Sequence, residues 1–181
     1  MSLLSMVNPL NASSLFSHRG GGVYNYLLKL LPCLIRQVET ANGQIAFLHL
    51  HFRPEPREHA ALLGRRMIPL RFPVRLLNHL WLKIGIPNLS RWLPEFQVVH
   101  SPHFSLPVMS KAAKVLTVND LTYLKHPEYF APSGRAVNEY GYRFLLPANA
   151  RRADRIIAIS EHTRQDLIEH FKVPEAKVSV V

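Results

Sequence analysis

Cysteine is almost absent from this sequence, and Cys33 is the only one. A single thiol excludes an internal disulfide and fits a reducing compartment. Because Cys33 falls within a helical pattern of apolar residues, we expect it to be a buried structural thiol and not a nucleophile. The sequence also lacks an apolar run long enough to span a membrane, and residues 1–7 lack the basic region and cleavable hydrophobic stretch of a signal peptide. We therefore expect a cytoplasmic protein, and peripheral attachment to the inner face of a membrane is compatible with this location.

Acidic residues are also scarce, at 12 Asp and Glu against 22 Lys and Arg. The resulting formal net charge of +10 predicts affinity for anionic partners such as phosphates, acidic lipid headgroups or nucleic acid. The charge alone does not distinguish between these partners. Hydrophobic residues make up 48% of the 181 residues, which is enough for one sizeable core. No internal repeat or low-complexity tract divides the sequence, so we expect residues 1–181 to form a single domain.

Between residues 64 and 93 the sequence contains no acidic residue at all. In this segment basic residues are interleaved with leucines and tryptophans, and the leucines recur at helical spacing between Pro73 and Pro87. A solvated basic face is the ordinary explanation of the charge, and burial of the leucine stripe in the core is the ordinary explanation of its apolar residues. The combination also fits a surface that lies on an anionic membrane. The residues assigned to this membrane or anion surface are Arg65, Arg66, Arg71, Arg75, Lys83 and Trp81.

The strongest local pattern lies between residues 153 and 167. Residues 156–159 form a short apolar run rich in β-branched residues, which is typical of a strand buried on both faces of a parallel sheet. Ser160 then predicts a helix N-cap, and Glu161 falls in the first turn, where the helix dipole favours negative charge. This segment predicts a strand, a tight turn and a helix, and ligands bind at such strand ends in open α/β sheets.

The rest of the sequence alternates between strand and helix patterns. Further strands are predicted at residues 3–7, 45–50, 96–100, 115–118 and 177–181. Helices are predicted at residues 23–38, between Pro73 and Pro87, and at residues 133–153 with Ser133 as N-cap; we expect Pro32 and Pro147 to kink their helices or, for Pro32, to shorten it. This alternation predicts an α/β fold, with a Rossmann-like, doubly wound and mostly parallel sheet flanked by helices. In such a sheet Asn119, Asp120, Ser160 and the loop Gly20–Gly22 meet at one edge.

Each candidate site residue has an ordinary structural explanation beside the functional one. Gly20, Gly21 and Gly22 precede a helix and suit either anion binding by backbone N–H groups or a plain turn. Asp120 follows a strand, where a carboxylate accepts a proton or binds a hydroxyl, or else forms an Asx-turn. Ser160 and Glu161 are explained by capping alone, although a cap at this place also lines the crevice. His103, in the loop after the third strand, is a candidate acceptor contact. The histidines lack recognised metal-site spacing, so we expect no metal.

Several motifs follow one another in a fixed order along the sequence: Gly21–Tyr26, His100–Phe104, Val118–Leu124, His126–Glu128, Arg151–Arg155 and Ile159–Thr163. Their order and spacing resemble the amino-terminal domain of family 4 glycosyltransferases, which are retaining enzymes of the GT-B architecture. The resemblance implies two Rossmann-like domains that face each other across a cleft. The amino-terminal domain mostly binds the acceptor, and the carboxyl-terminal domain binds a nucleotide-sugar donor.

The resemblance also implies a catalytic position at Asp120 and Asn119. Family members commonly carry His before this Asp, placed to contact the donor sugar; Asn119 can form hydrogen bonds there but cannot titrate. Because the sequence stops at Val181, we expect the carboxyl-terminal domain to be absent and the isolated chain to transfer nothing. The expected partners are a nucleotide-sugar donor, a glycan or lipid-linked acceptor and the missing domain, with no cofactor beyond the nucleotide-sugar co-substrate.

Two other functions remain open from the sequence. A nicotinamide-dependent oxidoreductase also uses a doubly wound sheet, but Gly20–Gly22 lacks a third spaced glycine and no acidic residue closes the second strand. A non-catalytic basic module bound to an anionic membrane would explain the charge. No motif that reads DNA or RNA accompanies that charge, so we do not expect a nucleic-acid partner.

Overall fold

Seven parallel strands form a single sheet in this computed structural model, which describes residues 7–11, 22–49, 66–129 and 140–181. Every neighbouring pair of strands is parallel, and the order is β3-β2-β1-β4-β5-β6-β7. The strand order reverses between β1 and β4, which is the topological switch point of a doubly wound sheet. The strands are β1 (Val7–Asn11), β2 (Gln44–His49), β3 (Arg66–Pro69), β4 (Val98–Ser101), β5 (Ala113–Val118), β6 (Arg155–Ala158) and β7 (Val178–Val180).

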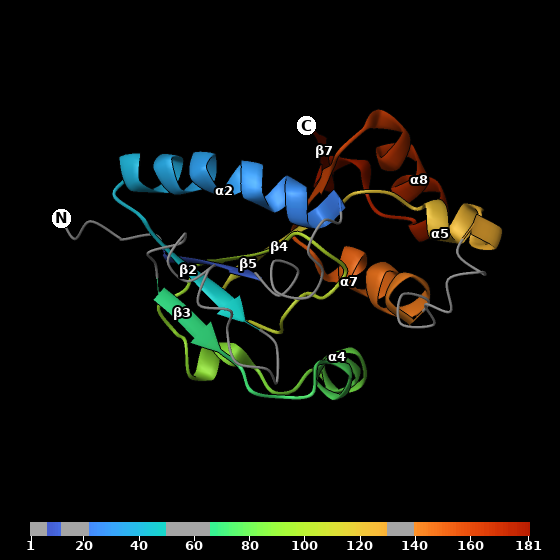
Figure 1. Ribbon diagram of the computed structural model, residues 1–181. Coiled ribbons are helices and arrows are strands. Elements are labelled where there is room, and N and C mark those ends of the chain that lie inside the picture. The colour runs from blue at the N-terminus through green and yellow to red at the C-terminus, as the bar shows by residue number, and fades with distance from the viewer. Residues whose placement is uncertain (1–6, 12–21, 50–65, 130–139) are drawn as a thin grey trace.

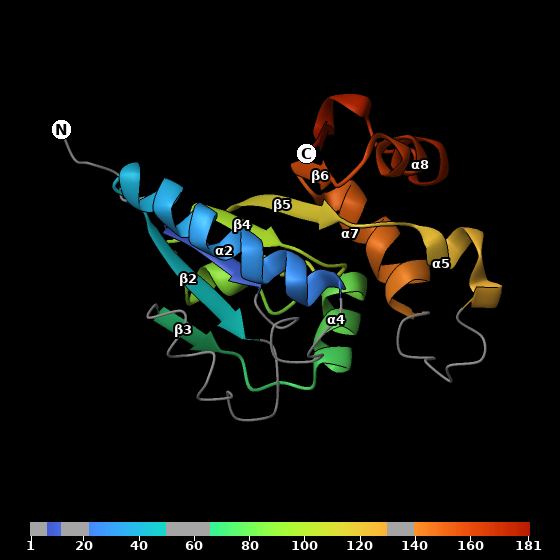
Figure 2. The ribbon, with the colours of Figure 1, turned by 45° about the horizontal axis from the view of Figure 1, so that its top comes forward.

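Helices cover both faces of this sheet. α2 (Gly22–Thr40) lies over one face, and α4 (Val74–Lys83) and α7 (Leu146–Arg152) lie under the other (Figure 1). α8 (Glu161–Phe171) packs against β6, β7 and α7, while the short helix α5 (Thr122–Lys125) follows β5. The strand arrowheads point toward the side where α5 lies (Figure 2). The predicted α/β class with a parallel sheet flanked by helices is therefore confirmed.

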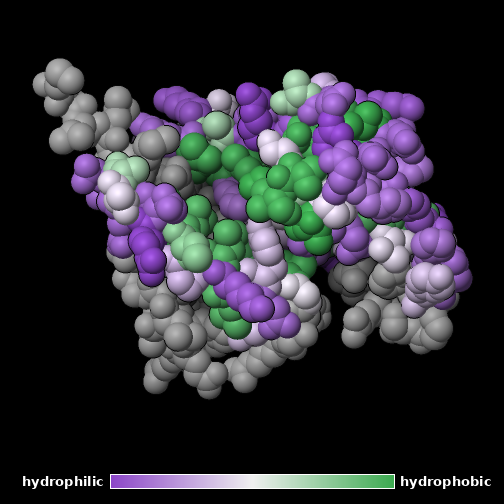
Figure 3. All heavy atoms as spheres, turned by 90° about the horizontal axis from the view of Figure 1, so that it is seen from above, coloured by the Kyte–Doolittle hydropathy of each residue, from purple (hydrophilic) through white to green (hydrophobic). Residues whose placement is uncertain are grey.

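Strand β2 shows why the sheet must be covered on both faces. Its residues 45–48 are all buried, as expected for a parallel strand between two layers of helices. Ile45 and Phe47 pack with Leu27 and Leu31 of α2, whereas the alternate residues of β2 belong to the larger core on the opposite face. Seen from the side of α2, apolar side chains also gather across the middle of the molecule (Figure 3).

Helix α2 bears on two expectations from the sequence, the effect of Pro32 and the burial of Cys33. It runs for 19 residues with Pro32 inside, so the proline does not shorten it. Leu27 and Leu31 are buried four residues apart and pack the part of the helix before Pro32 against the sheet. Cys33 is exposed, so the prediction of a buried thiol is wrong. Its position lies away from the buried leucine stripe when the helix period of 3.6 residues is applied.

Helix α4 forms where its leucine pattern predicts, between Pro73 and Pro87, but only part of that pattern is buried. Leu77 and Trp81 are buried, whereas Leu76 is 47% exposed. Trp81 is only 3% exposed, and its indole Nε1 donates a hydrogen bond to the carbonyl oxygen of Pro87 at 2.9 Å. The assignment of Trp81 to a membrane surface is therefore wrong, because a satisfied core tryptophan cannot contact lipid.

Strands β1 and β3 depart most from prediction. β1 occupies residues 7–11 instead of 3–7, and β3 was not predicted. β1 contains two asparagines and a proline, which strands disfavour, but it pairs with β2 on one side and β4 on the other. β3 is a short edge strand in the basic segment, and it pairs only with β2. Pairing with neighbouring strands therefore holds both segments in the sheet, although their own residues do not favour a strand.

The predicted helix at residues 133–153 is also rearranged. Ser133, its predicted N-cap, lies outside the described residues. The described part begins with a π-helical turn, Gly141–Leu145, in which the backbone N–H of Leu146 bonds to the carbonyl oxygen of Gly141. α7 then starts at Leu146 with Pro147 in its first turn. Proline is tolerated there because the first N–H groups of an α-helix need no intrahelical acceptor. The kink expected at Pro147 stays a prediction.

Candidate functional site

The carboxyl ends of β5 and β6 bring two predicted site segments together. β5 ends at Val118, directly before Asn119 and Asp120, and β6 ends at Ala158, two residues before Ser160. The hydroxyl Oγ1 of Thr163 in α8 donates to the carbonyl oxygen of Asn119 at 3.2 Å, which ties the two strand ends to each other. The prediction that Asn119, Asp120 and Ser160 lie at the same edge of the sheet is therefore confirmed.

A shallow pocket opens beside Asp120. Three of the predicted site residues, His103, Asn119 and Asp120, are among the residues that line it. Its enclosed space is about 10 Å³, roughly one water molecule. A sugar-sized ligand would therefore lie against this pocket and not inside it. The lining residues are His103, Phe104, Thr117, Val118, Asn119, Asp120, Tyr142 and Leu146.

Asp120 forms an Asx-turn and also borders the pocket. One carboxylate oxygen, Oδ1, accepts a hydrogen bond from the backbone N–H of Thr122 at 2.9 Å, which is an Asx-turn at the start of α5. The residue is nevertheless exposed and borders the pocket. α5 is held in turn by Lys125, whose ammonium pairs with the buried carboxylate of Asp166 in α8 at 3.0 Å. The turn fixes one oxygen of Asp120 and leaves the carboxylate able to accept a hydrogen bond from a ligand.

The loop that carries His103 is clamped by buried polar side chains from three elements. Ser101 Oγ, at the end of β4, lies 2.9 Å from the carbonyl oxygen of His103 and 2.5 Å from that of Ser105. Ser105 Oγ donates to Asn78 Oδ1 of α4 at 2.6 Å. Asn149 Nδ2 of α7 donates to the carbonyl oxygen of Phe104 at 2.6 Å. Sequence reasoning missed Asn78 and Asn149, although a buried Asn within an apolar helix face is itself a signal of such a bond.

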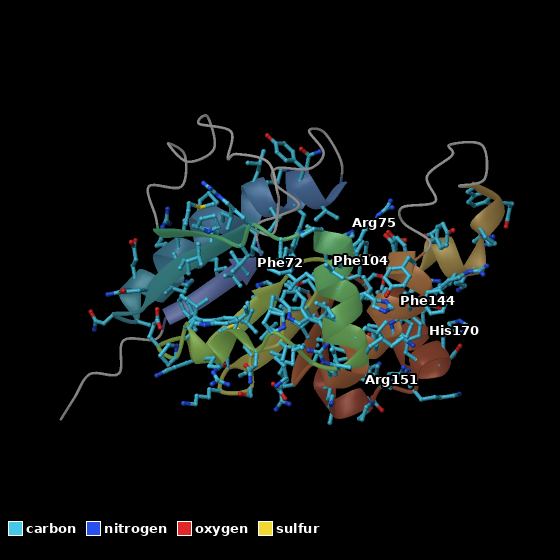
Figure 4. All side chains as sticks on the ribbon, turned by 90° about the horizontal axis from the view of Figure 1, so that it is seen from below. Phe72, Arg75, Phe104, Phe144, Arg151 and His170 are labelled. Carbon is cyan, nitrogen blue, oxygen red and sulfur yellow. The ribbon has the colours of Figure 1, made fainter. Side chains whose placement is uncertain are left out.

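Aromatic rings form one wall of the pocket. The ring of Tyr142 contacts Phe104 edge-on with centroids 5.8 Å apart and stacks on Tyr123 at 5.4 Å. Phe104 lies where α4 and α7 approach each other (Figure 4). Burial, with a further contribution from the negative charge of Asp120, raises the pKa of Tyr142 to about 12. Tyr142 therefore keeps its phenolic proton at neutral pH and offers a hydroxyl donor beside a carboxylate acceptor.

His100 supports the pocket from the interior of the sheet. It lies on β4 next to β5, and its Nε2 lies 2.8 Å from the hydroxyl Oγ1 of Thr117, which lines the pocket. Burial lowers the pKa of His100 to about 4, so the imidazole is neutral at pH 7. A neutral imidazole beside Thr117 fixes that side chain without adding charge. Sequence reasoning placed His100 in the loop motif and did not assign it a role.

The remaining predicted residues lie outside the pocket lining. Ser160 Oγ accepts from the backbone N–H of Thr163 at 3.1 Å, which is the predicted helix cap. Glu161 pairs with Arg164 at 2.6 Å, and Arg164 also pairs with Glu175, so Glu161 is engaged in an exposed ion-pair network. A ligand role for either residue stays a prediction.

The structure describes only Gly22 of the glycine loop, and it places Asn119 at the edge of the pocket. Gly22 is the exposed first residue of α2, and Gly20 and Gly21 lie outside the described residues. Anion binding by this loop therefore stays a prediction. Asn119 is half-buried, and its Nδ2 lies 3.5 Å from the carbonyl oxygen of Pro102, a long contact that leaves the amide able to turn toward a ligand.

Two further properties hold for the described part of the chain. No group of three or more His, Cys, Asp or Glu side chains within it is arranged to hold a metal ion. None of its helices is both long and apolar enough to cross a membrane.

One family model matches most of this chain. The family described as Glycosyltransferase Family 4 matches residues 20–181 of this chain. Among solved structures, a glycosyltransferase from Rickettsia africae ESF-5 is similar in fold, with a TM-score of 0.50 and 12% sequence identity. The similarity covers 98% of this chain and 42% of that one, so this chain spans less than half the length of that glycosyltransferase. Comparison with curated proteins gives no significant match. Because the family match extends over most of the sequence and the sheet has the corresponding doubly wound form, the chain belongs to glycosyltransferase family 4.

Proposed function

We propose that this chain is the acceptor-side domain of a retaining glycosyltransferase that moves a sugar from a nucleotide-sugar donor to a glycan or lipid-linked acceptor. The observation that carries the proposal is the pocket at the ends of β4 and β5, where Asp120 lies beside the neutral hydroxyl of Tyr142. Donor recognition is assigned to a second domain, and no cofactor is proposed beyond the nucleotide sugar.

The chemistry of this pocket suits a sugar acceptor. A sugar ring presents apolar C–H faces and polar hydroxyl groups, and aromatic walls combined with a few fixed polar groups bind both. Tyr142 and Phe104 supply the aromatic wall, and Asp120 accepts a hydrogen bond from an acceptor hydroxyl. Accepting that bond makes the hydroxyl oxygen a better nucleophile and aims it at the donor. The small enclosed space leaves the sugar exposed on its other side, where the donor must approach.

The clamped loop explains how this chemistry is positioned. Asn78, Asn149 and Ser101 fix the backbone around His103 and Phe104 by hydrogen bonds within the core. A binding site held by rigid supporting contacts loses less entropy when the ligand binds. His103 therefore contributes to acceptor binding from a fixed place in the pocket wall, beside Phe104, with ring centroids 3.7 Å apart.

Saturation-transfer NMR with a panel of methyl glycosides tests the proposal on the purified chain. We expect saturation transfer to at least one glycoside. The substitution Asp120→Asn is expected to weaken the apparent affinity by about tenfold or more, since a hydrogen bond to a charged group contributes about 1.5–3 kcal/mol. The matched control is Glu169→Gln, which removes an exposed carboxylate from α8 away from the pocket. Equal loss in both variants, or no transfer to any glycoside, would contradict the proposal.

A further inference from the structure

The outer side of α4 and the residues just before and after this helix expose an unusual combination of side chains. The described structure leaves five large apolar side chains of this segment between 47% and 63% exposed. Four cations are exposed in the same stretch, and the sequence has no acidic residue between 64 and 93. We call this set the α4 surface: Arg71, Phe72, Arg75, Leu76, Lys83, Ile84, Ile86, Arg91 and Trp92.

The geometry of α4 places cations and an apolar side chain side by side. Leu77 and Trp81 turn inward and fill the core. Applying the helix period places Arg75, Leu76 and Lys83 on the opposite, outward side. Figure 4 views the molecule from this side and labels Phe72 and Arg75 at the start of α4. The outward face of α4 is therefore both basic and apolar, whereas an ordinary solvated helix face is polar throughout.

The cations of this surface form no ion pairs with carboxylates in the part of the chain that the structure describes. Among the described residues, none of the four cations of the α4 surface has a carboxylate partner within ion-pair distance. By contrast, Arg164 and Lys125 on the opposite part of the molecule are paired with carboxylates. Unpaired cations keep their full attraction for an external anionic surface.

We propose that the α4 surface binds an anionic lipid bilayer. The exposed cations attract the headgroups, and the exposed apolar side chains enter the interface between headgroups and acyl chains. Tryptophan favours the headgroup level of a membrane. Trp92, which is 63% exposed, is therefore the tryptophan that contacts the headgroups, and the buried Trp81 is not. Nucleic acid would also attract the cations, but aliphatic Leu76, Ile84 and Ile86 offer nothing to phosphates or to stacked bases. The proposal does not depend on the function of the pocket.

The binding face is also joined to the pocket loop. Asn78 lies on the inner side of α4 and accepts the hydrogen bond from Ser105, two residues after His103. A bilayer that contacts the outer side of α4 would therefore lie within one helix diameter of the loop that carries the pocket residues. This placement suits an acceptor that is itself embedded in the membrane.

Co-sedimentation with vesicles tests the proposal with the whole chain. We expect binding to vesicles of phosphatidylcholine with phosphatidylglycerol at low salt, loss of binding at high salt, and little binding to phosphatidylcholine alone. The double variant Arg75→Gln/Lys83→Gln is expected to partition about thirtyfold less, since each cation contributes about fivefold. Leu76→Ser is expected to reduce partitioning about fivefold, because it removes an apolar group from the interface.

Helix α2 supplies a matched control on the opposite face of the sheet. Lys29→Gln/Arg36→Gln removes two exposed cations and gives the same net charge, and Leu28→Ser removes an exposed leucine. These variants are expected to bind vesicles like the wild type, and unchanged thermal unfolding shows that all variants fold. Equal losses on both helices would show a general charge effect and overturn the proposal, as would equal binding to neutral and anionic vesicles. Tighter binding to single-stranded RNA, or a dimer that Leu76→Ser disperses, would also overturn it.

Discussion

Gly141 is the position where a single methyl group should most clearly disturb the pocket. A Cβ atom built on Gly141 would lie 2.6, 2.7 and 2.9 Å from three atoms of the Phe104 ring. Carbon atoms in contact are normally about 3.5–4.0 Å apart, so the ring would have to move by roughly an ångström. That movement is opposed by the ring of Tyr142 on one side and by Asn149, which holds the Phe104 backbone. The wall of the pocket would therefore shift or remain strained.

Two opposing effects set the expected magnitude. Crowding a packed site costs about 1–3 kcal/mol, whereas replacing Gly with Ala within a helix contributes about 0.5–1 kcal/mol in the favourable direction. The net expectation for Gly141→Ala is a destabilisation of about 1–2 kcal/mol, and a Tm lower by several degrees. In a Phe104→Ala background the crowding disappears, so the same substitution should become neutral or stabilising by up to about 1 kcal/mol.

Urea unfolding followed by circular dichroism measures all four corners of this cycle. Gly22→Ala is the matched control, because a Cβ atom on Gly22 would meet nothing within 4 Å. It should leave stability unchanged or raise it. The reasoning is refuted if Gly141→Ala stabilises the wild type, or if its effect is the same with and without the Phe104 ring.

Three further predictions concern protons, the donor contact and the isolated chain. The pKa of His100 falls from 6.5 to about 4 on folding, so between these pH values the unfolded chain binds a proton that the folded chain does not. The free energy of unfolding should therefore fall by about 3 kcal/mol from pH 7 to pH 4. Urea titrations measure this change, and His100→Gln should remove most of it. Asn119→His, made in the protein joined to a donor-binding domain, should hold or raise the transfer rate, and a fall would show that Asn119 is an adaptation of this protein. The isolated chain should bind UDP- and GDP-sugars poorly in calorimetry and transfer nothing. Measurable turnover would contradict the assignment of acceptor binding to this domain and donor binding to a second one. A titration with NADH is expected to show no binding, which separates a glycosyltransferase domain from an oxidoreductase.

The carboxyl-terminal half of the sheet was predictable because local signals and tertiary structure agree there. Residues 155–158 form a strand with Ile156 and Ala158 buried, Ser160 caps α8, and Asp120 follows β5, much as their patterns predict. An apolar run between charged residues has few alternatives other than a buried parallel strand. The edge shared by Asn119, Asp120 and Ser160 then follows from the parallel topology alone.

The parts that could not be predicted depend on contacts far apart in sequence. β1 is a strand because β2 and β4 pair with it, and its own residues give a weak signal. Whether Trp81 faces solvent or the core depends on the exact rotation of α4 against the sheet, which spacing alone does not set. Tyr142 joins Asp120 only because a π-helical turn places it beside the end of β5, and no sequence pattern announced that turn.

Amide chemical-shift mapping of the isotope-labelled chain tests the central proposal most directly. Methyl glycosides are expected to shift the amide signals of His103, Phe104, Asn119, Asp120 and Tyr142 in a saturable way, while UDP- and GDP-sugars at the same concentrations leave them in place. Shifts confined to another part of the molecule, or a response of the pocket to nucleotide sugars and not to glycosides, would contradict an acceptor site at the ends of β4 and β5.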